Sequence, residues 1–214
     1  MVSRTEEEEL AVIKEWWARN GQPLLTGSVL ALVIVFGWQG WQKYQTNQAE
    51  GASQLYQQLL ETALNPSGEP DAAKVAELAN RLKNDFAGSH YAQYGRLFVA
   101  KVAVEAGEPA DAVAELEAII AEPADDNLAE LARQRLARVL ASQDKTAEGL
   151  ALLEADVDQA YLASREELKG DLLVLLGRND EAHAAYMKAK AALSEDAAVG
   201  GLQMKLDDLA KGDA

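Results

Sequence analysis

The side chains best able to do chemistry in this chain are two histidines and three pairs of adjacent acids. His90 and His183 lie far apart in the sequence, and neither has a carboxylate at the spacing of zinc ligands. The acidic pairs are Asp125-Asp126, Glu166-Glu167 and Asp207-Asp208, which we interpret as helix caps or solvated helix faces. The sequence also has no cysteine, no Gly-x-Ser-x-Gly, no Walker motif and no dinucleotide fingerprint. We therefore expect no catalytic, cofactor-binding or metal site and a protein that acts by binding.

An uncharged apolar stretch, Leu24 to Trp41, determines how the rest of the chain is organised. As a helix it would extend roughly 27 Å, close to the ~30 Å hydrocarbon core of a bilayer. The alternative is a buried core helix of a soluble domain, although such helices usually carry a polar face. A cleaved signal peptide would have a basic start, a shorter apolar core and a small-x-small cleavage site. This stretch instead follows Glu6 to Glu9 and ends in Trp-Gln-Gly-Trp, so we predict an uncleaved signal anchor at residues 23–43.

Aromatic residues lie where the edges of the bilayer would meet this segment. Tryptophan and tyrosine are enriched at membrane–water interfaces, and the candidates for such positions are Trp16, Trp17, Trp38, Trp41 and Tyr44. Three basic residues, Arg4, Lys14 and Arg19, precede the span, whereas only Lys43 follows it closely. Because lysine and arginine favour the cytoplasmic side, we expect a cytoplasmic N-terminus and a translocated C-terminal domain.

Residues 1–22 predict a short amphipathic helix ahead of the span. Ser3-Arg4-Thr5-Glu6 has the form of a capping box. The apolar face that follows at helical spacing consists of Leu10, Ile13, Trp16 and Trp17. Asn20-Gly21 predicts the end of this helix, and Pro23 suits the first turn of the next one. We interpret the segment as a membrane-surface helix, with a cytoplasmic docking motif for a partner as the alternative.

The acidity of the chain is concentrated after the span. The whole chain has a formal net charge of −15, and residues 45–214 carry 16 basic and 30 acidic side chains, a net of −14. A domain this acidic repels nucleic acid and anionic lipid headgroups, so binding to a phosphate backbone is excluded as its main activity. Solubility is the simplest explanation of the charge.

Residues 44–214 contain no convincing strand pattern, and turn signals divide them into helices. We expect helices at 45–64 and 71–86, the first ending at Asn65-Pro66-Ser67-Gly68. Three helix pairs should follow, at 89–106 with 110–121, at 127–142 with 146–156, and at 159–176 with 180–193. A last helix from Ala197 carries Val199, Leu202, Leu206 and Leu209 on one face. Such a helix would cover the apolar end of a stack of repeats.

The three pairs share a repeating pattern of small and large residues. Their turns lie at Gly107, Asp144 and Gly177, at spacings of 37 and 33 residues. The small residues predicted to let the two helices of each pair approach are Ala100, Ala137 and Gly170 on the first helix, and Ala112, Gly149 and Ala182 on the second. The large residues predicted to fill the groove to the next pair are Leu116, Leu153 and Tyr186. A period of about 34 residues with this pattern is typical of tetratricopeptide repeats, although a generic helical bundle is the alternative.

The predicted fold is therefore all-α, with an N-terminal single transmembrane helix followed by a solenoid of tetratricopeptide-like hairpins and a C-terminal capping helix. Repeat hairpins expose a long surface suited to extended peptides or partner helices. Tyr91, Tyr94 and Tyr161 could supply aromatic contacts on that surface, and each could equally belong to the core.

Several stretches, taken in order, give the chain a family resemblance. They are Ile13 to Gly21, Phe36 to Trp41, Asp126 to Leu128 running into Leu136 to Val139, and Leu202 to Leu209. In these the chain resembles the YfgM family of proteobacterial inner-membrane proteins, the ancillary subunit of the SecYEG translocon. The resemblance implies a periplasmic repeat domain and association with SecYEG and with PpiD, a membrane-anchored periplasmic chaperone. It also implies a role in passing emerging secreted proteins to folding factors, and no catalytic residues.

Two functions of different class fit these observations. One is a chaperone-network subunit at the translocon that binds PpiD-like partners or nascent secreted chains. The other is a membrane-tethered scaffold that organises envelope or cell-division proteins without a link to secretion. A physical complex with the translocon distinguishes the two. A cytoplasmic adaptor is a third possibility and requires the opposite membrane orientation.

Overall fold

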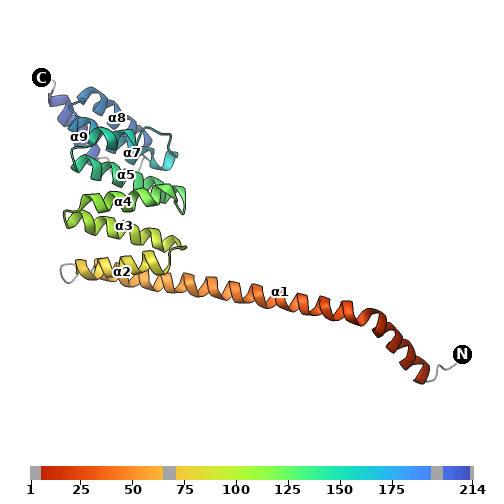
Figure 1. Cartoon of the computed structure of the whole chain (residues 1–214). Helices are drawn as coiled ribbons and strands as arrows, with labels where there is room; N and C mark the ends of the chain where they lie inside the picture. The colour runs from red at the N-terminus through yellow and green to blue at the C-terminus, as the bar shows by residue number, and fades with distance from the viewer. Residues whose placement is uncertain (1–5, 65–70, 194–199, 213–214) are drawn as a thin grey trace. The chain divides into compact units, whose positions relative to one another are not determined.

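The computed structural model describes residues 6–64, 71–193 and 200–212, and every regular element there is a helix (Figure 1). The chain divides after Gly51 into two units, and the first helix contributes to both. The helices are α1 Glu6–Ala63, α2 Ala72–Asp85, α3 His90–Glu105, α4 Pro109–Ala121, α5 Asp126–Ser142, α6 Thr146–Ala151, α7 Gln159–Leu175, α8 Asn179–Ala192 and α9 Gly200–Gly212. The all-α prediction is confirmed.

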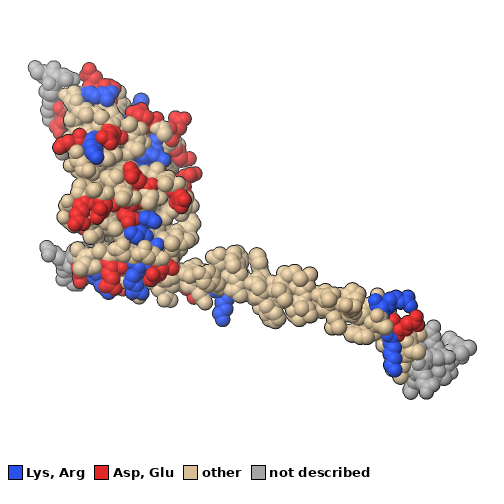
Figure 2. Space-filling view, viewed as in Figure 1, with Lys and Arg blue, Asp and Glu red and all other residues tan. Residues whose placement is uncertain are grey.

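The first unit is the part of α1 that ends at Gly51. Among the described residues, α1 is the one helix that is long and apolar enough to cross a membrane. The large apolar side chains between Leu24 and Trp41 are exposed, so no protein core accounts for their apolar character. The sequence has no charged residue between Arg19 and Lys43, and Figure 2 shows a long stretch of this helix without charged side chains. An apolar helix that contacts no protein core is what a membrane anchor requires.

The predicted break between a surface helix and the span is wrong, because α1 runs through Asn20-Gly21 and Pro23 without ending. Polar side chains on either side of these residues bond to backbone carbonyls of the same helix. The Asn20 side chain donates to the Trp16 carbonyl at 3.0 Å, and the Thr26 hydroxyl lies 3.0 Å from the Pro23 carbonyl. Proline bends a helix without always ending it, and the ribbon of α1 curves in its N-terminal part (Figure 1). The predicted capping box at Ser3 to Glu6 begins outside the described residues.

Side-chain caps set the start of several helices in the second unit. Asp71 accepts a hydrogen bond from the Lys74 amide at 3.0 Å, Ser89 from the Ala92 amide at 3.2 Å, and Asp125 from the Leu128 amide at 2.8 Å. Each cap satisfies an amide that the first turn of a helix leaves free. The observed starts of α2, α3 and α5 therefore lie within a residue of the predicted ones. The predicted stop at Asn65 to Gly68 lies outside the described residues.

The three predicted turns have one backbone geometry. Gly107, Asp144 and Gly177 have φ values of 78°, 62° and 71°, the left-handed region that ends helices. In each turn the next residue donates its amide to a carbonyl five residues earlier. These bonds are Glu108 to Ala103 at 2.8 Å, Lys145 to Leu140 at 3.0 Å, and Arg178 to Leu173 at 2.9 Å. The pairs α3–α4, α5–α6 and α7–α8 are therefore repeats of one helical hairpin.

Helix α6 is shorter than predicted, because it ends at Ala151 rather than near Asp156. After Ala151 the chain forms a tighter turn, in which the Leu153 amide donates to the carbonyl of Leu150, three residues earlier, at 3.0 Å. The Ala155 carbonyl then accepts a hydrogen bond from the Arg165 guanidinium of α7 instead of from a helical amide. A buried side chain from the next repeat thus supplies a hydrogen bond that a continuing helix would otherwise have made.

The core of the second unit is a series of apolar clusters along the chain. The first joins the end of α1 to α2, the second joins α3, α4 and α5, and the third runs from α5 to α9. Helices that are consecutive in sequence pack on one another, so the hairpins form a stack (Figure 1). Leu202 and Leu206 of α9 are buried in the third cluster, as expected for a capping helix. The predicted start of this helix, Ala197 to Val199, lies outside the described residues.

Candidate protein-binding surface

Small residues bring the two helices of the α5–α6 hairpin into direct contact. Gly149 is buried, and a Cβ atom added to it would lie 2.6 Å from the Ala137 carbonyl oxygen. Such a distance is shorter than any ordinary van der Waals contact, so the approach depends on glycine. The structure also buries the other sequence-predicted packing residues: Ala100, Ala112, Leu116, Ala137, Leu153, Gly170, Ala182 and Tyr186.

In the α7–α8 hairpin the ring of Tyr186 lies against Gly170. A Cβ atom at Gly170 would lie 2.2 Å from the ring, so this tyrosine fills the space that a side chain would occupy. The Tyr186 hydroxyl donates to Asp171 at 2.8 Å, and Lys205 of α9 contacts the same carboxylate at 2.6 Å. Burial, and then the nearby carboxylates, raise the pKa of Tyr186, which keeps the phenol protonated as a donor. Tyr186 therefore links its own hairpin to the capping helix.

A buried ion pair between successive hairpins is absent from the sequence prediction. Arg165 of α7 donates two hydrogen bonds to the Glu130 carboxylate of α5, one of them at 2.9 Å, and both side chains are almost fully buried. Gln134 donates to Glu130 at 2.9 Å and to Ser164 at 3.0 Å. Within the described residues no buried side-chain polar atom lacks a hydrogen-bond partner. We call this group the α5–α7 clamp: Glu130, Gln134, Ser164 and Arg165.

The clamp holds its carboxylate in the charged form. Burial alone would raise the pKa of Glu130, but hydrogen bonds from Arg165 and Gln134 outweigh it and lower that pKa. Glu166, which the sequence suggested would be a cap or a solvated residue, is also buried and pairs with Lys169 at 3.7 Å. The sequence signal for the clamp is the 35-residue separation of Glu130 and Arg165, which matches the repeat period.

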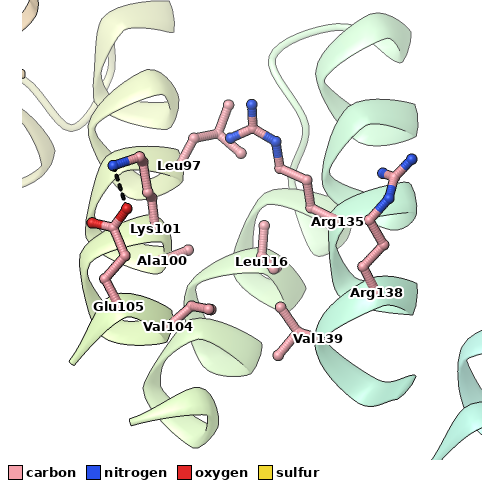
Figure 3. A pocket seen from close by; sticks show the side chains of 9 residues that line it. All are labelled: Leu97, Ala100, Lys101, Val104, Glu105, Leu116, Arg135, Arg138 and Val139. Carbon is pink, nitrogen blue, oxygen red and sulfur yellow. Dashed lines mark hydrogen bonds and ion pairs between the residues drawn. The ribbon is translucent and has the colours of Figure 1, made fainter. Parts of the chain in front are cut away.

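A groove of about 310 Å³ lies between α3 and α5 (Figure 3). Its apolar lining consists of Leu97, Ala100, Val104, Leu116 and Val139, from both helices and from α4 behind them. Its polar lining consists of Lys101 and Glu105 on α3, and Arg135 and Arg138 on α5. An apolar lining with a few charged groups is typical of a ligand-binding cleft.

Three tyrosines form an aromatic cluster between the end of α1 and α3, within the second unit. The ring of Tyr56 lies 5.3 Å from those of Tyr91 and Tyr94, which are 6.2 Å from each other. Partial burial, and then the neighbouring phenols, raise the pKa of Tyr56. All three remain partly exposed. Tyr161 lies elsewhere, where its hydroxyl donates to Asn127.

The predicted membrane-interface residues belong to the first unit, and the two histidines do not line the groove. Trp16, Trp17, Trp38, Trp41 and Tyr44 are all exposed on α1. The indole of Trp17 covers Gly21, where an added Cβ atom would lie 3.0 Å from the ring. His90 lies 3.7 Å from Asp125, and His183 is exposed on α8. In the part of the chain that the structure describes, no group of acids and histidines is placed to hold a metal ion.

A helix of membrane-anchor character and a stack of helical hairpins define the class of this protein, an anchored helical-repeat protein. The family described as "Tetratricopeptide repeat-like domain" matches residues 14–211, which include both parts. No solved structure matches the chain.

Similar proteins share one name. The chain is 28% identical to the ancillary SecYEG translocon subunit of Escherichia coli (strain K12), over 97% of this chain and 98% of the relative. It is 31% identical to the subunit of Aggregatibacter actinomycetemcomitans, over 86% of this chain and 88% of the relative. It is 29% identical to the subunit of Neisseria gonorrhoeae (strain ATCC 700825 / FA 1090), over 95% of this chain and 97% of the relative. The chain therefore belongs to the family of ancillary SecYEG translocon subunits, and the resemblance noted in the sequence is confirmed.

Proposed function

We propose that this protein is an ancillary subunit of the SecYEG translocon in the bacterial inner membrane and that it acts by binding other proteins rather than by catalysis. The observation that carries the proposal is the extent of the family match. The relatives bearing that name align with almost the whole chain, anchor and repeats together. A repeat domain alone would support only a general binding role, because helical repeats serve many partners.

The membrane topology is part of the proposal. Residues 1–22 lie in the cytoplasm, 23–43 cross the membrane and 44–214 form a periplasmic repeat domain. The excess of basic residues before the span supports this direction. Exposed tryptophans at Trp16, Trp17, Trp38 and Trp41 support a position across the bilayer, because their indoles suit its two interfaces.

The repeat domain links the translocon to a membrane-anchored periplasmic chaperone of the PpiD type and so to nascent secreted proteins. The groove between α3 and α5 and the tyrosine cluster supply exposed surface for such contacts. The resemblance of the sequence to its family supports the chaperone contact, and the exposed groove and tyrosine cluster support a protein-binding role for the repeat domain.

Co-purification from the native membrane tests the proposal. The full-length protein is extracted in a mild detergent that keeps the translocon intact, and bound proteins are identified by mass spectrometry. We expect translocon subunits and a membrane-anchored periplasmic chaperone. The matched control is an unrelated single-pass protein of the same orientation, which should recover neither.

Two variants assign the contacts. In one, residues 23–43 are replaced by an unrelated apolar span, which should release partners that bind within the membrane. In the other, residues 197–214 are deleted, which should release partners that need the capped end of the stack. If the wild-type protein recovers neither partner while the translocon itself stays intact, the proposal fails and an envelope scaffold becomes the better explanation.

A further inference from the structure

The groove between α3 and α5 differs in charge from the domain that contains it. Its lining has three basic side chains and one acidic side chain, whereas residues 45–214 carry a net charge of −14. Lys101 and Glu105 pair with each other at 2.6 Å, so their charges largely cancel. Arg135 and Arg138 therefore give the groove its positive character.

These two arginines are available for an external anion. Among residues 6–64, 71–193 and 200–212, no acidic side chain forms an ion pair with either arginine, and both arginines are exposed. The side chain of Arg135 reaches from α5 toward Leu97 of α3, at the edge of the apolar floor (Figure 3). Although the residue as a whole is exposed, partial desolvation of its guanidinium lowers the pKa of Arg135, and the charge of Arg138 lowers it further. A carboxylate bound between the two arginines would relieve their mutual repulsion.

We propose that this groove binds an extended segment of a partner protein that carries a carboxylate side chain beside large apolar ones. The inference rests on the proposed adaptor function and names the chemistry of the ligand. The carboxylate binds Arg135 and Arg138, and a neighbouring apolar side chain enters the floor formed by Leu97, Val104 and Val139. Guanidinium groups bind carboxylates with paired, charge-assisted hydrogen bonds, and an apolar surround strengthens them.

The acidity of the rest of the domain makes the site selective. An acidic segment is repelled by the surface elsewhere, so the groove is the place where its charge is stabilised. A nucleic acid would meet the same repulsion along its whole length, and the contacts with Arg135 and Arg138 would offset little of it. A peptide with one or two carboxylates fits the local charge better.

Peptide binding to the full-length protein in mild detergent tests the inference. The probe is a short fluorescent peptide, blocked at both ends, that carries two glutamates among leucines. A matched probe has glutamine in place of glutamate, so the two differ in charge and hardly in size. We expect fluorescence anisotropy to show about tenfold weaker binding of the glutamine probe, because one charge-assisted contact is enough for that difference.

Variants locate the binding to the groove. Arg135→Gln with Arg138→Gln should reduce affinity for the glutamate probe about tenfold, to that of the glutamine probe. Val104→Ser should weaken the binding of both probes, because Val104 is an exposed part of the apolar floor. The control, Arg81→Gln with Arg178→Gln, removes two exposed arginines outside the groove and should leave binding unchanged. Circular dichroism checks that each variant keeps its helical content and melting temperature.

Charge reversal keeps the test decisive. Arg135→Glu with Arg138→Glu should reject the glutamate probe and bind a lysine version of it. Equal binding of the glutamate and glutamine probes to wild type, or unchanged binding after the Arg135 and Arg138 substitutions, would overturn the inference. So would tighter binding of a single-stranded oligonucleotide than of the glutamate probe. Failure here with intact translocon co-purification rejects the groove alone, whereas loss of that co-purification rejects the proposed function itself.

Discussion

At the scale of single residues, the hairpins depend on places where a side chain is missing or small. Gly149 meets the Ala137 carbonyl, and Gly170 meets the ring of Tyr186, so the helices approach more closely than larger residues would permit. The sequence pattern indicates which residues these are. It does not indicate that Tyr186 packs inside its own hairpin as well as toward the next element, because a ring can fill either space.

Gly149→Ala should destabilise the repeat domain by about 1–2 kcal/mol. The new Cβ atom would lie 2.6 Å from the Ala137 carbonyl oxygen, and the backbone of α5 or α6 must move to make room. The cost is partly offset because alanine favours a helix more than glycine does. Urea unfolding of the full-length protein, followed by circular dichroism, measures the change. Gly88→Ala is the control, because an added Cβ atom there meets no atom within 4 Å. Equal stability of the two variants would contradict the close approach.

The α5–α7 clamp is a feature that the sequence pattern does not predict. Glu130 and Arg165 are charged residues, and charged side chains are rarely fully buried, so residue type alone favours a surface position. Their burial follows from the stacking of two hairpins, which brings residues one repeat apart into contact. Only the assembled stack distinguishes this pair from the many solvated ones.

Glu130→Gln should lower the free energy of unfolding by about 3–5 kcal/mol at neutral pH, because it leaves Arg165 buried without a counter-charge. The pKa of Glu130 is lower in the folded protein than in the unfolded chain. Its stabilisation is therefore complete above the unfolded glutamate pKa of about 4.3 and is lost as the pH falls through the lower folded pKa. We expect the difference in stability between wild type and variant to shrink below about pH 4.3.

Unfolding measured across this pH range tests the prediction. Glu117→Gln changes an exposed glutamate and should alter stability little at any pH. A difference between wild type and Glu130→Gln that stays constant down to low pH would show that the carboxylate charge is not what stabilises the clamp.

At the scale of the elements, sequence reasoning predicts the hairpins well because their boundaries are local. Side-chain caps such as Ser89 and Asp125 and left-handed residues such as Gly107 act within a few residues of themselves. The predicted helix boundaries are wrong where a helix bends instead of ending, or where a residue distant in the sequence binds the backbone. Helix α1 continues through Pro23 because a helix can bend at a proline, and α6 ends early where Arg165 from the next repeat binds the backbone.

Leu206→Ala should loosen the capping helix and the hairpin beneath it. Leu206 is 5% exposed in the third apolar cluster, and truncating a buried leucine costs about 2–5 kcal/mol. Because repeats depend on their neighbours, we expect faster amide hydrogen exchange in α8 and α9 and little change in α3 and α4. Met204→Ala on the exposed face of α9 is the control. Uniformly faster exchange across the domain would show that the stack unfolds as one unit.

At the scale of the whole molecule, the count of lysines and arginines on either side of the span predicts the orientation of the protein in the membrane. A reporter that is active only outside the cytoplasm, fused after Ala214, should be active. The same reporter fused after Arg19 precedes the span and should be inactive. The expected orientation is rejected if the reporter after Ala214 is inactive while a cytoplasmic reporter at the same point is active.

The order in which the helices pack has a consequence for how this protein is made. Within the described residues, each helix from α2 to α9 packs on a helix next to it in the sequence, and the further contacts, such as α3 with α5 and α5 with α7, span short sequence distances. A chain of low contact order can fold piece by piece as it emerges, since no hairpin must wait for a distant segment. The hairpins can therefore close in sequence from the anchor outward. The capping helix α9 can pack once the hairpin before it, α7–α8, has closed.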